Sequence, residues 1–152
     1  MQMKTIVKQS VAGTIMMTSF SYLLSAASGN DYREPRLLAT MLHRLGVKPS
    51  YPAGWLAHFA AGFAWAPILR RMATRLQKKR PLTKILVLGL SSGVAAVAIW
   101  RSMFALHPNS PRNNRKTFYA QLVLAHMIFS LPFSMDHSPK PSLPQTPREG
   151  KL

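Results

Sequence analysis

Two histidines, His58 and His126, are the only readily titratable side chains deep within long uncharged stretches of this 152-residue chain. Imidazoles can ligate a metal or a haem iron, or relay protons. An ionisable residue inside a membrane helix is a functional candidate by default. The alternative is a pair of neutral histidines that hydrogen-bond across helices with Gln121 or with serine and threonine hydroxyls. No carboxylate accompanies the pair to orient a ligand imidazole, so the sequence names no cofactor and leaves metal binding open.

Other patterns that could do chemistry have simpler interpretations. Residues 89–93, GLSSG, match the G-x-S-x-G pattern of serine hydrolases, but that motif requires a strand–turn–helix context. Here it lies inside an expected helix, where Gly89 and Gly93 indicate close helix packing. The absence of cysteine excludes disulfides and thiolate chemistry. Catalysis by paired carboxylates is disfavoured because the chain has only four acidic residues, Asp31, Glu34, Asp136 and Glu149. We therefore expect no catalytic residues and no enzyme.

Four stretches without Asp, Glu, Lys or Arg must position these residues, and they cover residues 11–29, 50–69, 85–100 and 117–135. About 20 apolar residues of helix cross a hydrocarbon core of about 30 Å. Flanking arginines can lengthen the shorter stretches by snorkelling. We predict an all-α transmembrane four-helix bundle in residues 1–135, with spans at about 9–28, 53–72, 83–104 and 117–135. A soluble helical protein is the alternative, but its helices would carry charges on their outer faces.

The segments between the predicted spans have their own patterns. Residues 35–45 predict a short interfacial amphipathic helix, because Pro35 suits a first turn and one stripe is apolar. The stripe contains Leu37, Leu38, Met41, Leu42 and Leu45. A cap over the bundle is the alternative for this helix. Residues 136–152 hold four prolines among polar residues and predict a disordered tail.

The distribution of cations predicts the orientation. The chain has 20 Lys and Arg against 4 Asp and Glu. The densest run follows the second predicted span and would anchor to anionic lipid headgroups; its members are Arg70, Arg71, Arg75, Lys78, Lys79 and Arg80. No aromatic residues are interleaved with it, so we expect no nucleic-acid partner. With this run, the amino terminus and the tail on one side, the cations divide 12 to 8, which predicts both termini in the cytoplasm.

The amino terminus also matches a signal peptide. Lys4 and Lys8 precede an apolar stretch, and Ser25, Ala26 and Ala27 form a small-residue cleavage site. Cleavage after Ala27 would leave three spans. We favour a retained first helix, because threonines and serines interrupt the apolar stretch and further spans follow it.

Several motifs resemble those of small, uncharacterised four-span membrane proteins of bacteria. They are Arg33-Glu34-Pro35, Gly54-Trp55-Leu56-Ala57-His58, Trp100 with Leu106-His107-Pro108-Asn109, and Phe118-Tyr119 through His126. The resemblance implies a multi-pass protein of the cell inner (cytoplasmic) membrane and no established activity.

Two hypotheses for function follow. The first is a non-catalytic membrane protein that acts by helix packing with a second copy of itself or with a membrane-protein partner. Its close-packing surfaces would come from small residues in the second and third predicted spans, namely Ala57, Ala61, Gly62, Gly89 and Gly93. The second is a small transporter, or a haem- or metal-binding membrane protein, that uses His58 and His126.

Overall fold

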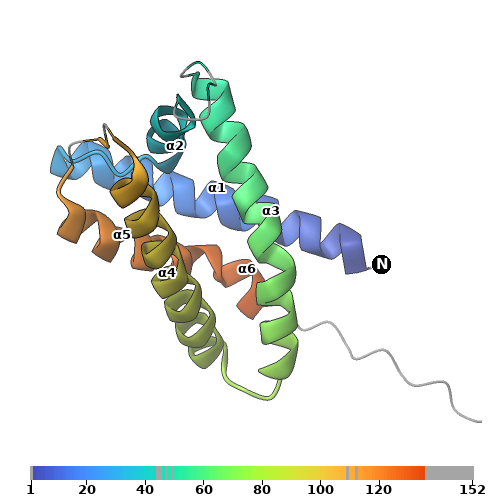
Figure 1. Ribbon diagram of the computed structural model, residues 1–152. Helices are drawn as coiled ribbons and strands as arrows, with labels where there is room; N and C mark the ends of the chain where they lie inside the picture. Colours follow the sequence, from blue (N-terminus) through green and yellow to red (C-terminus); the bar gives the residue numbers. More distant parts are fainter. Residues whose placement is uncertain are drawn as a thin grey trace, which may run out of the picture.

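The computed structural model describes residues 2–43, 46, 48, 50–108, 110–111 and 113–135 (Figure 1). Helices make up most of this part of the chain, and it contains no strand. The all-α prediction is therefore confirmed for it. The helices are α1 (Gln2–Ser28), α2 (Glu34–Leu42), α3 (Tyr51–Arg75), α4 (Pro81–Leu106), α5 (Arg115–Phe129) and α6 (Leu131–Ser134). The predicted tail, residues 136–152, lies outside the described residues.

Local sequence signals set where several of these helices begin and end. Helix α1 is followed by Gly29 with φ +70°, a left-handed conformation that glycine adopts without strain. The Ser50 side chain caps α3 by accepting the Ala53 N–H at 3.2 Å. Asn114 caps α5 in the same way, from the Thr117 N–H at 3.3 Å. Such capping satisfies backbone donors that have no partner within the helix.

Three helical segments are long and apolar enough to cross a membrane: Met3–Ser28, Pro81–Leu106 and Arg115–Ser134. The last of these combines α5 and α6. Helix α3, which contains the predicted span at 53–72, has 25 residues but is not among them. Its glycines and prolines, its histidine and the arginines of its last turns make it less apolar than the other three.

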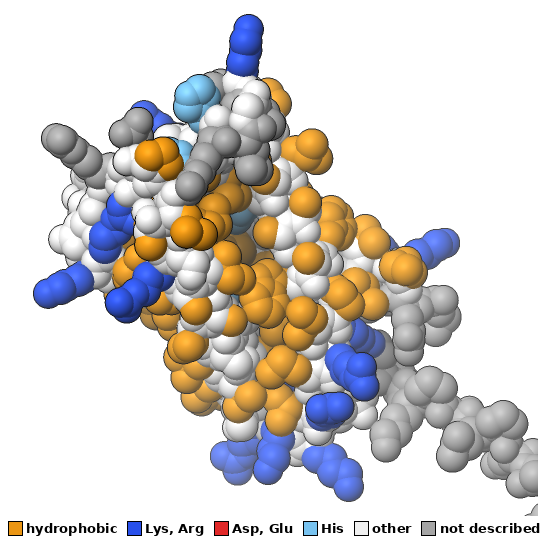
Figure 2. Space-filling model, in the orientation of Figure 1, with side chains coloured by type: hydrophobic (Ala, Val, Ile, Leu, Met, Phe, Trp, Pro, Cys, Tyr) orange, Lys and Arg blue, Asp and Glu red, His pale blue; other side chains and the backbone are white. Residues whose placement is uncertain are grey.

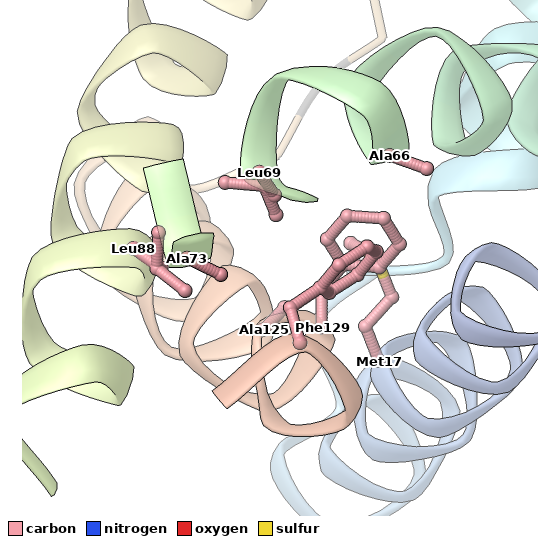
Figure 3. Close-up of a cluster of buried hydrophobic side chains, with 8 residues drawn as sticks. Met17, Ala66, Leu69, Ala73, Leu88, Ala125 and Phe129 are labelled. Atoms are coloured by element: carbon pink, nitrogen blue, oxygen red, sulfur yellow. The ribbon is translucent and has the colours of Figure 1, made fainter. Parts of the chain in front are cut away.

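Helices α3 and α4 form a hairpin at the front of the molecule in Figure 1, and α1 and α5 cross behind them. Side chains from all four helices point toward one another in a first core cluster, most of which is labelled in Figure 3. It contains Met17, Ala66, Leu69, Ala73, Leu88, Ala125, Phe129 and Phe133. This cluster packs α1 and α3 of the first half of the chain against α4, α5 and α6 of the second half.

A second core cluster includes α2. It contains Tyr32, Leu37, Met41, Ala96, Trp100, Phe104, Phe118 and Leu122. Five of the nine residues of α2 are buried, among them Leu37 and Met41 of the predicted stripe. Such burial fits the cap over the bundle better than an interfacial helix with one face in lipid. The last residue of the predicted stripe, Leu45, lies outside the described residues.

Lysine and arginine side chains gather toward both ends of the face in Figure 2, with an apolar band between them. Of the predicted headgroup anchors, Arg70 is half-buried, whereas Arg71, Arg75, Lys78, Lys79 and Arg80 are exposed. Lys84, in the first turn of α4, is not exposed as those five cations are. Its side chain is buried, and its Nζ donates to the Ser134 carbonyl at 3.4 Å, because α6 packs against the start of α4.

Candidate functional site

A cavity of about 140 Å³ lies between the two core clusters, with walls from α1, α2, α3, α4 and α5. Most of its lining is apolar. Its polar and titratable lining residues are Thr14, Glu34, His58 and His126, and its aromatic residues include Trp65 and Trp100. The two histidines that the sequence singled out therefore line one cavity, although no hydrogen bond joins their rings in the described part of the chain.

His58 is buried and bound to α1. Its Nε2 lies 2.8 Å from the Thr18 Oγ1, and the same hydroxyl donates to the Thr14 carbonyl at 2.6 Å. A hydroxyl has one proton, so Thr18 must accept from His58. The neutral ring is therefore protonated at Nε2 and keeps Nδ1 as an acceptor. This contact agrees with the predicted alternative of a histidine bonded to a threonine.

His126 is buried and bound within its own helix. Its Nδ1 lies 2.9 Å from the Leu122 carbonyl, which can only accept, so Nδ1 holds the proton. The neutral ring then keeps Nε2 as an acceptor. Each histidine thus brings to the cavity wall a ring with one acceptor nitrogen.

A carboxylate lines the same cavity, contrary to the expectation that none accompanies the histidines. Glu34, the first residue of α2, is 1% exposed. The Ser21 Oγ donates to its Oε1 at 2.7 Å, and the Gln121 Nε2 donates to the same oxygen at 3.3 Å. Gln121 also donates to the Ser21 Oγ at 2.6 Å. The Gln121 side chain was a predicted hydrogen-bond partner of the histidines. It donates to Glu34 and Ser21 instead.

Burial raises the pKa of Glu34 to about 7, because an ionised carboxylate loses hydration when it is enclosed. The hydrogen bonds from Ser21 and Gln121 oppose this rise, and the charge of Asp31 adds to it. Asp31 itself lies nearer the surface, with its Oδ1 2.8 Å from the Arg33 Nε. Glu34 is therefore an acid that can exchange a proton near neutral pH.

Sequence reasoning missed Glu34 because it lies in a connector between predicted spans. A signal was nevertheless available. Glu34, Leu37 and Met41 are spaced i, i+3 and i+7, which places them on one face of a helix. The apolar stripe that predicted the helix therefore also predicts that Glu34 faces the same way as Leu37 and Met41, and all three are buried.

The small residues predicted to pack helices are mostly used within the chain. A Cβ at Gly89 would lie 2.5 Å from the Met127 Cα, and one at Gly93 would lie 2.9 Å from the Val123 Cα. A Cβ at Gly62 would collide with Thr14. These glycines bring α4 close to α5 and α3 close to α1. Of the two alanines, Ala57 is half-buried and Ala61 is exposed.

The donor groups give no cluster for a metal. Among the described residues, no three or more His, Cys, Asp or Glu side chains lie close enough together to hold an ion. The cavity is also similar in size to engineered cavities of about 150 Å³ that bind benzene. It therefore suits a small organic molecule better than a macrocycle such as haem.

No family model, curated protein or solved structure matches this chain. The cavity and the helices that form it are therefore the features that bear on function. Its titratable lining residues are Glu34, His58 and His126. Thr18 is hydrogen-bonded to His58, and Ser21 and Gln121 are hydrogen-bonded to Glu34.

Proposed function

We propose that this chain is a four-span protein of the bacterial inner membrane that binds a small organic molecule in the cavity lined by Glu34, His58 and His126. It acts as a small transporter or carrier and has no catalytic activity. The single observation that carries the proposal is the cavity, which unites a carboxylate and two imidazoles from α2, α3 and α5. Buried ionisable groups in a membrane protein are costly and mark ligand or ion pathways.

Helix α3 serves as the fourth span. Residues 51–69 carry no Asp, Glu, Lys or Arg, and 19 helical residues extend about 28 Å, close to the thickness of the hydrocarbon core. The arginines follow at its end, where their aliphatic stems can reach the headgroups. Helix α4, which is apolar enough to span, follows after a short connector. The resemblance to small four-span bacterial membrane proteins supports the same topology.

The basic connector supports the proposed orientation and the proposed lipid partner. Five of its six predicted anchors are exposed, and anionic headgroups attract such cations by about 1 kcal/mol each. The positive-inside rule then places this connector and both termini in the cytoplasm. A second copy or another membrane protein is a further candidate partner, through the small exposed side chain of Ala61.

The cavity, and not a packing surface, is favoured as the functional feature because three of the five predicted packing residues are buried against neighbours in the same chain. Gly62, Gly89 and Gly93 are buried there. Their role in holding the bundle together leaves less surface for a partner. Each histidine ring makes one hydrogen bond and Glu34 uses only its Oε1, which leaves these groups capacity to bind a ligand.

Benzyl alcohol is a suitable probe for the cavity because it is a neutral aromatic of nearly benzene size. In a Trp55→Phe background the remaining tryptophans, Trp65 and Trp100, both line the cavity. We expect a saturable change of their fluorescence when benzyl alcohol is added to the purified protein in lipid nanodiscs. Ala96→Leu, which adds a larger side chain to the cavity wall, is expected to abolish it.

The matched control is Ala98→Leu, which makes the same change at an exposed position of the same helix. It should bind benzyl alcohol as the Trp55→Phe protein does. A response that does not saturate, or that is equal in Ala96→Leu and Ala98→Leu, would show that the probe dissolves in the lipid and that the cavity binds nothing.

A further inference from the structure

Glu34 has an unused hydrogen-bonding capacity. Its Oε1 accepts from Ser21 and Gln121, but its Oε2 is buried and accepts no hydrogen bond from the described residues. The Thr14 Oγ1, on another part of the cavity lining, is also buried without a partner among them. An ionised carboxylate is expensive to bury unless it is paired with a cation. With the cavity empty, the lower-cost state of Glu34 is therefore the protonated one.

Among the described residues that line the cavity, none is a Lys or Arg that could pair with Glu34. The side chains that α4 contributes are Ala96, Ile99, Trp100 and Met103. Each imidazole makes one hydrogen bond as a donor, which the neutral ring satisfies with its single N–H. A bound cation would therefore be the counter-ion of Glu34, and it could also donate to an imidazole acceptor nitrogen.

The apolar part of the lining favours an organic cation over a hydrated inorganic one. Trp65 and Trp100 line the cavity together with Met17, Met103 and Leu122. Tryptophan is the side chain that attracts organic cations most strongly through its ring. An apolar lining does not replace the water shell of a small metal ion, but it does suit the hydrocarbon part of an amine.

The cavity opens toward the apolar surface of the bundle. Ile99 of α4 is 49% exposed and Ala61 of α3 is also exposed, and both line the cavity. The face formed by α3 and α4 shows an apolar band between groups of cations in Figure 2. A ligand that dissolves in lipid can reach the cavity through this band without passing the basic ends of the molecule.

We propose that the ligand is a small lipophilic amine in its protonated form, bound with the Glu34 carboxylate as its counter-ion, so that binding of the ammonium ion releases the proton that Glu34 holds in the empty cavity. The exchange is balanced: the carboxylic acid loses one proton to solvent, one ammonium ion enters, and the net charge of the site is unchanged. This assignment rests on the proposed function, because it names the class of molecule that the cavity binds.

Proton competition gives the exchange a defined pH dependence. Below the pKa of Glu34, affinity for the ammonium ion falls by about tenfold per pH unit. Charged and titratable groups near Glu34 are Asp31 and Arg33 before it in the chain and Tyr22 of α1. His58 of α3 and His126 of α5 share the cavity with it, and the α4 residues of the lining bring no charge.

Benzylamine, which is protonated near neutral pH, and benzyl alcohol form a matched pair of probes that differ mainly in charge. At pH 8, in the Trp55→Phe background, we expect Glu34→Gln to weaken benzylammonium binding about tenfold to a hundredfold, as for loss of a charged hydrogen bond. Because Glu34 lines the cavity, Glu34→Gln should affect benzyl alcohol binding as well, but far less than it weakens benzylammonium binding. Asp31→Asn, which removes a nearby surface acid, should change neither. In weak buffer at about pH 6, one unit below the pKa of Glu34, about one proton should appear per benzylammonium bound.

The outcomes separate the two proposals. Binding of benzyl alcohol with no stronger binding of benzylammonium, or with equal benzylammonium binding by Glu34→Gln, would overturn the amine assignment and leave the cavity function standing. Binding of neither probe would overturn the proposed function itself. If Glu34→Gln loses benzyl alcohol as well, the protein with Glu34 intact decides: absence of proton release and of the pH dependence would overturn the assignment.

Discussion

Replacing Gly89 with leucine is expected to destabilise the bundle by about 3 kcal/mol or more, because overpacking costs 1–3 kcal/mol even where side chains can move aside. Here the new side chain meets backbone, since a Cβ would lie 2.5 Å from the Met127 Cα. Helices α4 and α5 would have to separate. We expect a lower thermal midpoint in detergent and a loss of the monodisperse peak in size-exclusion chromatography.

Gly89→Ala gives a sharper test than Gly89→Leu, because two effects predict opposite signs for its change in stability. Helix propensity alone predicts that Gly89→Ala stabilises by about 1 kcal/mol, whereas the close approach of Met127 predicts destabilisation. Ser91→Ala is the control, because it changes an exposed residue of the same helix to alanine and adds no volume. A midpoint of Gly89→Ala that equals or exceeds that of the unmodified protein would contradict the close approach of α4 and α5.

Stability is expected to fall as pH rises from about 4.5 to about 7 and to change little through Glu34 above that range. Burial raises the pKa of Glu34 in the folded protein above its ordinary value of 4.5. The folded state therefore holds more protons than the unfolded state over this range, and each rise in pH favours unfolding. The accumulated loss is about 3 kcal/mol.

Glu34→Gln isolates this contribution from those of the other titrating groups. The amide has nearly the same shape, and its oxygen can still accept from Ser21, but it does not ionise. The difference between the thermal midpoints of the two proteins, measured in detergent from pH 4 to 8, should therefore grow in favour of Glu34→Gln as pH rises. A difference that is constant with pH would show that Glu34 is solvated.

The sequence was enough to predict the helices because uncharged stretches are a property of local composition. Residues 11–28, 85–100 and 117–134 of the first, third and fourth stretches fall within helical segments that are apolar enough to span. The second stretch, residues 50–69, is helical, yet its composition does not place α3 among those segments. The proposal that α3 is a span therefore rests on its uncharged length and on the apolar helix α4 that follows it.

The candidate site was predicted only in part because long-range packing assembles it. His58 and His126 could be selected by residue type, and both line the cavity. Glu34 could not be selected in this way, since a charged residue in a connector is ordinarily solvated. Its burial depends on Ser21 and Gln121, which are 13 and 87 residues away in the chain. The periodicity of α2 was the one local sign of it.

We propose that α3 crosses the membrane and so holds His58 in a cavity within the bilayer. The chain has no cysteine, so each introduced cysteine is a unique label site. Ser28→Cys, at the end of α1, and Gln77→Cys, between α3 and α4, are both exposed positions. A membrane-impermeant maleimide applied to intact bacterial spheroplasts should label Ser28→Cys and leave Gln77→Cys unlabelled until the cells are permeabilised. Labelling of both cysteines in intact spheroplasts would place α3 outside the membrane and contradict the four-span topology.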